Sequence, residues 1–338
     1  MLAGTSARRA PSMCYRLTGM IRPISIVALL GWAALLQPPA LSQEATCLRR
    51  TLPLTVADSQ GVPIEGLGAT DFEARFRAGP VKILSIVPDD RPHRIVILVD
   101  ASATMATKWR EVLAPASDLA ETSLPNTKMA LIVFKDKIEE QINFSDGQSA
   151  VAERLRQMRS TVMSRQTTGG RTAIFDSLLA GLRLLETPTS ADSLYLVSDG
   201  ADNASHAHLD DIAQTLSNNG VRVFVSLILG HLGQRSATPE EQGGPFDMNE
   251  LAKKTGGLLN TPFGQGIPTK PQQAERLSQT MHKFYQAMAQ NYRLELELPT
   301  ALEKPTTWEL KLSDQGAMHG RNETLTLTYP TQLAPCKR

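Results

Sequence analysis

The chain has 338 residues, of which 41% are hydrophobic and 20% are charged, with a formal net charge of +1. This length allows about two domains, and the composition is that of an ordinary globular protein with a sizeable core. The first 42 residues hold four arginines and no acidic residue, which leaves 31 basic and 34 acidic residues elsewhere, a net charge of −3. Nothing in this balance indicates a nucleic-acid surface.

An apolar run of 13 residues, Ile24 to Leu36, follows these arginines and precedes the small residues Ala40 and Ser42. Basic, apolar and small residues in this order are typical of a secretory signal peptide, here residues 1–42 with cleavage after Ser42. The run is short for a membrane-spanning helix. We therefore expect a secreted, periplasmic or cell-envelope protein with no membrane span after cleavage; an uncleaved N-terminal anchor is the alternative.

Three cysteines occur, and Cys14 is lost with the signal peptide. The remaining pair, Cys47 and Cys336, lies at the two ends of the exported chain. In an oxidising compartment a bridge between them would stabilise the fold by roughly 2–5 kcal/mol, because it closes a very long loop. Two unpaired thiols in frayed termini are an equally acceptable interpretation.

Polar and apolar residues alternate at both ends of the exported chain, in residues 43–90 and 291–338. The alternating stretches are 52–56, 72–76, 81–87, 294–298, 308–312 and 325–329. Such alternation is typical of half-buried antiparallel strands. We expect both segments to pair into one small β-sandwich from which the middle of the chain emerges as an insertion. Two separate β modules, with more exposed strand edge, are the alternative.

Buried strands alternate with amphipathic helices in residues 91–290. Strands are expected at 95–99, 129–134, 194–197 and 221–229, a polar edge strand at 139–144, and helices at 109–119, 151–158, 173–185, 209–216, 248–254 and 274–288. This order predicts an α/β domain with a doubly wound, mainly parallel sheet. Pro115 is expected to kink or divide its helix. The Gly- and Pro-rich residues 230–245 are expected to form an insertion.

Oxygen-bearing side chains follow two of the buried strands. Asp100, Ser102 and Thr104 come after the first strand, and Asp199 follows the strand at 194–197. Thr172 comes after two glycines, at the start of a helix. Ligands of open α/β folds bind outside the carboxyl ends of the strands, so these five side chains can converge there. An all-oxygen set suits a hard divalent cation, Mg²⁺ or else Mn²⁺ or Ca²⁺.

The pattern Asp100-x-Ser102-x-Thr104, then Gly-Gly-x-Thr172, then Ser-Asp199-Gly resembles the metal-ion-dependent adhesion site of the von Willebrand factor type A domain. The resemblance covers about residues 94–288, and the wider layout is similar to secreted bacterial proteins with such a domain. It implies that the three hydroxyls are metal ligands and that the two aspartates act directly or through water. Thr104 stands where that family usually has serine, and its extra methyl group can alter the affinity for the metal.

The resemblance implies a binding protein rather than an enzyme, in which the metal captures an acidic side chain of a protein partner. Residues 230–245 are a reasonable place for partner specificity. Two alternatives remain: a scaffold with an unused metal site and, less favoured, a metal-dependent phosphatase. The phosphatase pattern requires a second aspartate where Ser102 stands. The pair His206 and His208 is interpreted as solvent-facing residues at a helix start, because two histidines alone do not make a zinc site.

Overall fold

The computed structural model contains two sheets and describes residues 47–76, 79–160, 171–229, 238–264, 266–314, 316 and 324–336. The predicted signal peptide, residues 1–42, lies outside these residues, as does Cys14. Residues 40–338 belong to one compact unit. In the part of the chain that is described, no helix combines the length and the apolar character needed to cross a membrane.

The first sheet has six strands in the order β6-β5-β4-β7-β8-β9. Five of them run parallel: β4 (His93–Asp100), β5 (Thr127–Phe134), β7 (Ser193–Ser198), β8 (Arg222–Leu227) and β9 (Leu259–Asn260). The sixth, β6 (Ile138–Ile142), pairs antiparallel with β5 and lies at the edge, where its polar residues face solvent. The sheet is therefore mixed, mainly parallel with one antiparallel edge strand. The short strand β9 was not expected from the sequence.

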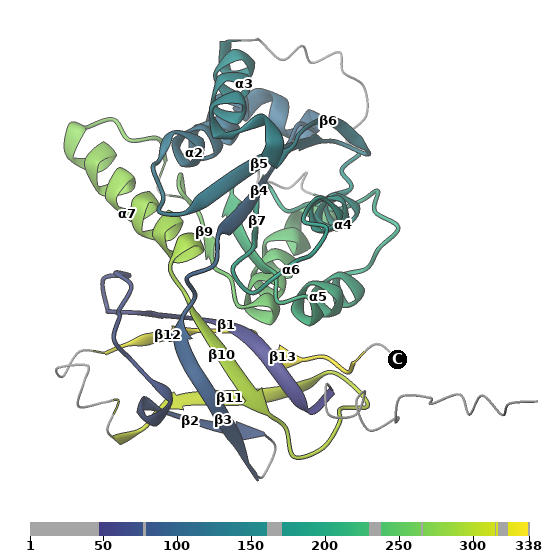
Figure 1. Cartoon of the computed structure of the whole chain (residues 1–338). Helices are drawn as coiled ribbons and strands as arrows, with labels where there is room; N and C mark the ends of the chain where they lie inside the picture. The colour runs from purple at the N-terminus through teal and green to yellow at the C-terminus, as the bar shows by residue number, and fades with distance from the viewer. Residues whose placement is uncertain are drawn as a thin grey trace, which may run out of the picture. The chain divides into compact units, whose positions relative to one another are not determined.

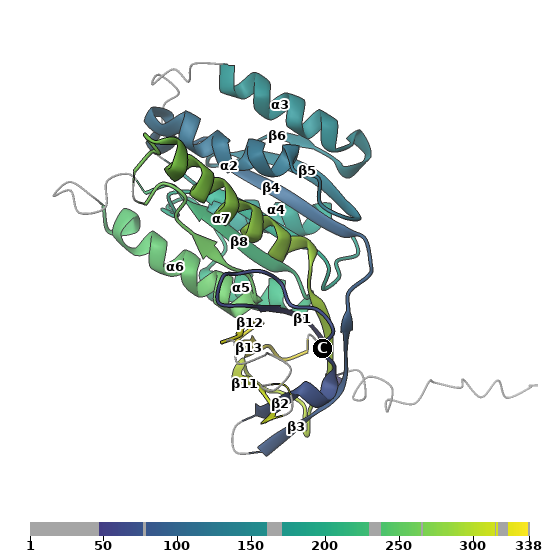
Figure 2. The same ribbon diagram turned by 90° about the vertical axis from the view of Figure 1, so that its left-hand side faces the viewer.

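Helices of the described residues cover both faces of this sheet (Figures 1 and 2). One face carries α2 (Trp109–Glu121), α3 (Gln148–Ser160) and α7 (Pro271–Ala289); the other carries α4 (Ile174–Leu184), α5 (Leu209–Asn218) and α6 (Pro239–Thr255). The apolar run of β4 explains why both faces are covered, because successive side chains of a strand point to opposite faces. Ile95, Ile97 and Val99 enter one core and Val96 and Leu98 the other, all fully buried.

The structure differs from expectation at two places in these helices. Pro115 does not divide α2, which continues from Trp109 to Glu121. Val112 and Leu119 on either side of the proline are fully buried, and Tyr285 of α7 donates a hydrogen bond of 2.9 Å to the Pro115 carbonyl, so packing holds both halves together. Residues 239–245 are the first part of α6 rather than an insertion. Thr238 directly precedes the helix, and residues 230–237 of the predicted segment lie outside the described residues.

The second sheet has seven antiparallel strands in the order β12-β1-β10-β3-β2-β11-β13. The strands are β1 (Arg49–Ala57), β2 (Phe72–Phe76), β3 (Gly79–Pro88), β10 (Tyr292–Glu297), β11 (Thr306–Leu312), β12 (Thr326–Thr328) and β13 (Gln332–Leu333). Strands from both ends of the chain are neighbours; Leu52 of β1, for example, lies opposite Leu294 of β10. One continuous, curled sheet replaces the two stacked sheets that were expected, because β3 pairs with β10 on one side and with β2 on the other.

The inner face of this sheet encloses its own apolar core, which includes Leu54, Phe72, Leu294 and Trp308. Two short 3-10 helices lie in connecting segments of the described chain: η1 (Ala69–Asp71) directly precedes β2, and η3 (Phe144–Asp146) follows β6.

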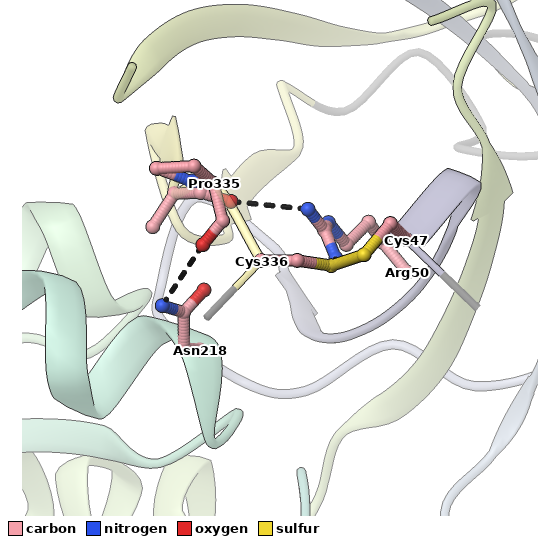
Figure 3. The surroundings of a disulfide bond; sticks show 6 residues. Cys47, Arg50, Asn218, Pro335 and Cys336 are labelled. Atoms are coloured by element: carbon pink, nitrogen blue, oxygen red, sulfur yellow. Dashed lines mark hydrogen bonds between the residues drawn. A yellow bond between two sulfur atoms is a disulfide. The ribbon is translucent and has the colours of Figure 1, made fainter. Parts of the chain in front are cut away.

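A disulfide joins Cys47 to Cys336, with 5.7 Å between the two Cα atoms (Figure 3). Arg50 donates hydrogen bonds to the Cys336 sulfur, at 2.9 Å, and to the Ala334 carbonyl, at 3.1 Å. On the other side of this segment, the side chain of Asn218 at the end of α5 donates to the Pro335 carbonyl at 3.3 Å. The last described residues of the chain are therefore tied both to β1 and to the α/β domain.

Candidate metal site

The turn after β4 presents three of the five predicted ligands. Asp100 ends the strand, Ser102 caps the 3-10 helix η2 (Ala103–Lys108), and Thr104 lies inside that helix. The Ser102 backbone N–H donates to Asp100 Oδ1 at 2.9 Å, and the hydroxyls of Ser102 and Thr104 are 3.0 Å apart. Asp100 and Ser102 have no exposed surface. The turn therefore directs one carboxylate and two hydroxyls to the same place.

The end of β7 is joined directly to this turn. The Ser198 hydroxyl donates to Asp100 Oδ2 at 2.6 Å and accepts from the Gly200 N–H at 3.0 Å. Between them in sequence, Asp199 accepts the Ala201 N–H at 3.1 Å through its Oδ1. Asp199 therefore follows a residue that is in contact with Asp100, as expected for adjacent parallel strands whose carboxyl ends share one edge.

Thr172 is the fifth predicted ligand, and backbone contacts place it at the same edge. Its N–H donates to the Asn203 side chain at 2.8 Å, and its carbonyl accepts the Asn203 N–H at 3.0 Å. The next residue, Ala173, donates to the carbonyl of Lys135, just after β5, at 2.8 Å. Thr172 is 1% exposed and precedes α4 by two residues. The glycines before it, residues 169 and 170, lie outside the described residues.

Two negative charges are close together in this buried turn. Burial and, to a smaller extent, the charge of Asp199 together raise the pKa of Asp100 to about 7, although hydrogen bonds from Ser198 and Ser102 act in the opposite direction. The ionised form of Asp100 is therefore disfavoured in the protein without a cation. A positive ion bound between the two carboxylates would remove that penalty.

The donor set fits a hard divalent cation, because it consists of two carboxylates and three hydroxyls. It does not resemble a zinc site rich in histidine or cysteine. Among the described residues, no group of three or more His, Cys, Asp or Glu side chains is arranged to hold a metal. The His206 ring instead contacts the Asp176 carboxylate at 2.9 Å and is almost fully exposed, and His208 precedes α5 as its N-cap.

A glycine contact packs α6 against the loop of Asp199. Gly200 has φ +86°, a conformation that disfavours side chains. A Cβ atom added to Gly244 of α6 would lie 2.4 Å from the Gly200 carbonyl oxygen. This close approach requires a residue without a side chain at position 244, so this glycine of α6 serves packing rather than a loop.

Sequence reasoning did not assign roles to Ser198 or Asn203. Ser198 could have been noticed, since it precedes Asp199 at the end of a buried strand, where a hydroxyl needs a partner. Asn203 gives no such signal, because its side chain receives a backbone N–H from a segment 31 residues earlier.

Comparison with known proteins supports this fold. Residues 95–254 match the family model of the von Willebrand factor type A domain. Comparison with curated proteins finds no significant match.

Solved structures to which the chain is similar include proximal thread matrix protein 1 from the mussel byssus (17% identity, TM-score 0.42), covering 61% of this chain and 49% of that one. They also include BatB from Bacteroides thetaiotaomicron (17% identity, TM-score 0.38), covering 57% of this chain and 98% of that one. One structure of the mussel protein has a zinc-occupied metal-ion-dependent adhesion site (18% identity, TM-score 0.41), with coverages of 61% and 49%. The chain thus spans about half the length of the mussel protein. From the match of the family model, the chain contains a von Willebrand factor type A domain at residues 95–254.

Proposed function

We propose that this domain binds a divalent cation, Mg²⁺ or else Mn²⁺ or Ca²⁺, and through it the carboxylate of a protein partner. The residues that would hold the cation are Asp100, Ser102, Thr104, Thr172 and Asp199. The role is recognition rather than catalysis, and the signal-like N-terminal sequence together with the Cys47–Cys336 bridge favours a location outside the cytoplasm.

The proposal rests on one observation: the Asp100 side chain is fully buried, and the negative charge of Asp199 acts on it. Burying a carboxylate is costly, and a second negative charge close to it adds to the cost. A cation is the ordinary way to compensate such a pair, and the neighbouring hydroxyls of Ser102 and Thr104 are uncharged ligands of the kind such ions accept.

The ligand composition also supports the role of the partner. Two carboxylates and neutral hydroxyls leave the bound cation strongly electrophilic, since hydroxyl oxygens donate little charge. Magnesium prefers six oxygen ligands and commonly keeps water in part of its shell, which a partner's carboxylate can replace. The residues of this chain hold and orient the ion: Asp100 is fixed by Ser102 and Ser198, and Thr172 by Asn203.

The experiment is thermal unfolding with Mg²⁺, with Mn²⁺ and with EDTA, on the wild type and on Asp199→Asn. At a concentration of 100 times its dissociation constant, the metal should stabilise the wild type by about 2.7 kcal/mol. The Asp199→Asn variant should lose most of this increment. The matched control is Asp90→Asn, which removes an exposed carboxylate beyond the other end of β4 and should retain it.

Binding of a partner is tested by pull-down from a cell-envelope fraction with and without EDTA. We expect EDTA and Asp199→Asn to abolish capture of the same protein. Capture that is equally strong with EDTA would exclude binding through the metal.

A scaffold with an unused metal site is the second candidate, and one observation favours it. Both oxygens of Asp100 already accept hydrogen bonds from protein groups, so the turn is organised without an ion. A melting temperature that does not respond to Mg²⁺, Mn²⁺ or EDTA would support the scaffold and overturn the proposal.

A further inference from the structure

Lys108 lies beside the candidate metal site but was not among the predicted ligands. It is the last residue of η2, four residues after Thr104. Its neighbours Met105 and Trp109 are 1% and 8% exposed, so packing fixes this part of the backbone. Within the described residues, the Lys108 ammonium nitrogen is buried and makes no hydrogen bond.

A second lysine with little exposed side chain shows how unusual this arrangement is. The ammonium of Lys254 in α6 contacts Asp210 at 2.7 Å and Glu250 at 2.6 Å. Buried ammonium groups are normally paired in this way, because an unpaired one is expensive. Lys108 instead interacts with its acidic neighbours at longer range.

Those neighbours connect Lys108 to the metal site. Burial lowers the pKa of the Lys108 ammonium, and the charges of Asp199 and Glu111 oppose that effect. The same Asp199 charge acts on Asp100. Asp199 therefore interacts electrostatically both with Asp100 and with the Lys108 ammonium, which belongs to the same short helix as Thr104.

We propose that Lys108 is a resident positive charge of the metal site that weakens its affinity for divalent cations. In the absence of metal, the ammonium partly balances the two carboxylates. A divalent ion bound to the same carboxylates is repelled by it. This inference rests on the proposed function, because it concerns the same site.

The charge of Lys108 also couples the metal to the partner. A carboxylate that completes the metal shell brings a negative charge toward the ammonium and offsets the repulsion. Metal and partner then strengthen the binding of each other, since such coupling is reciprocal. Lys108 thus disfavours the site with metal alone relative to the site with metal and partner bound together.

The experiment is calorimetric titration of the full exported chain with Mg²⁺ alone. It compares the wild type with Lys108→Met, with the charge-retaining Lys108→Arg, and with Lys128→Met. Lys128 is an exposed residue near the amino end of β5, so its variant has the same change in net charge away from the site. Melting without metal is measured for all four proteins as a check of folding.

We expect Lys108→Met to bind Mg²⁺ roughly three- to tenfold more tightly than the wild type, since a like charge has been removed from a partly buried site. Lys108→Arg and Lys128→Met should stay within about twofold of the wild type. Melting of Lys108→Met without metal should not fall, because the substitution also removes a buried, unpaired ammonium.

The outcomes separate this inference from the proposed function. Equal or weaker Mg²⁺ binding by Lys108→Met, with a wild type that binds, overturns the role of Lys108 and leaves the metal site standing. An equal gain in Lys108→Arg also overturns it, because charge is then not the cause. Binding by Lys108→Met but not by the wild type supports it. Absence of binding in both overturns this inference together with the proposed function.

Discussion

Buried aspartates at the two ends of strand β4 have different hydrogen-bond donors, charged at one end and neutral at the other. At the amino end, the Arg94 guanidinium donates to both oxygens of Asp192, at 2.9 and 2.7 Å, and Asp192 has no exposed side-chain surface. Arg91 binds Asp89 in the same two-pronged manner, at 2.7 and 2.5 Å. At the carboxyl end, the hydrogen bonds to Asp100 come from neutral donors, the Ser102 N–H and the Ser198 hydroxyl.

The pKa values of Asp89 and Asp100 follow this difference. Burial raises the pKa of Asp89, but the hydrogen bond and charge of Arg91 and a hydrogen bond from Ser190 outweigh it, so the net shift is downward. The pKa of Asp100 instead rises to about 7 through burial and the charge of Asp199. At the amino end, arginines of the chain pair directly with the buried aspartates, whereas Asp100 at the carboxyl end accepts hydrogen bonds from neutral groups; in our proposal a bound cation supplies the missing charge there.

The largest predicted effect is at the amino end. Arg94→Met leaves Asp192 buried without its guanidinium, and breaking a buried pair in this way costs about 3–5 kcal/mol of unfolding free energy. Urea unfolding in EDTA measures it, and Arg183→Met on the exposed side of α4 should change stability by less than about 0.5 kcal/mol. Added metal should increase the unfolding free energy of Arg94→Met no more than that of the wild type. A loss of unfolding free energy below about 1 kcal/mol in Arg94→Met would contradict the view that the Arg94–Asp192 ion pair stabilises the amino end of β4.

The second prediction concerns pH and the carboxyl end. The pKa of Asp100 in the folded protein, about 7, lies above its ordinary value of 3.8, so between these values the folded protein keeps a proton that the unfolded chain has lost. The contribution of this group to stability is therefore fully present below pH 4 and is lost as pH rises through 7.

Urea unfolding in EDTA from pH 4 to pH 8, on the wild type and Asp100→Asn, measures this contribution. Asp100→Asn should lose less stability than the wild type as pH rises, and at pH 8 in EDTA it should be at least as stable. Saturating Mg²⁺ should reverse that order. Parallel pH profiles of the two proteins in EDTA would contradict the account of a destabilised buried carboxylate.

The smallest predicted effect is that of the threonine in the adhesion-site pattern. Thr104→Ser keeps the hydroxyl that lies 3.0 Å from Ser102 and removes one methyl group. Because the oxygen donor is unchanged, Mg²⁺ affinity measured by calorimetry should change by less than about threefold. Thr104→Val, which replaces the hydroxyl by a methyl group, should weaken binding much more. Equal affinities for the serine and valine variants would remove Thr104 from the set of ligands.

Much of the fold could be predicted from patterns that one segment carries by itself. The apolar runs of β4 and β7 and the periodicity of α7 indicated their elements within a few residues. What failed depends on contacts between distant segments. Gly244 of α6 is a glycine because its backbone packs closely on Gly200, and Pro115 lies in a helix held by the Tyr285 hydrogen bond and by the core.

In the candidate site, too, the residues that follow from one segment could be predicted, and those that depend on distant segments could not. Asp100, Ser102 and Thr104 could be identified because they follow one strand at alternate positions, and Asp199 because it ends another. Ser198, Asn203 and Lys108 were not assigned roles, since their importance arises from partners on other elements. A sequence pattern shows which groups can be ligands, but not which charges surround them.

The most direct test of the metal site is anomalous scattering from crystals of the exported chain grown with Mn²⁺. We predict one strong peak among the oxygens of Asp100, Ser102, Thr104, Thr172 and Asp199, absent from crystals of Asp199→Asn grown in the same way. A wild-type map with no peak at this edge of the sheet, at a Mn²⁺ concentration that saturates any binding seen in solution, would contradict the central claim.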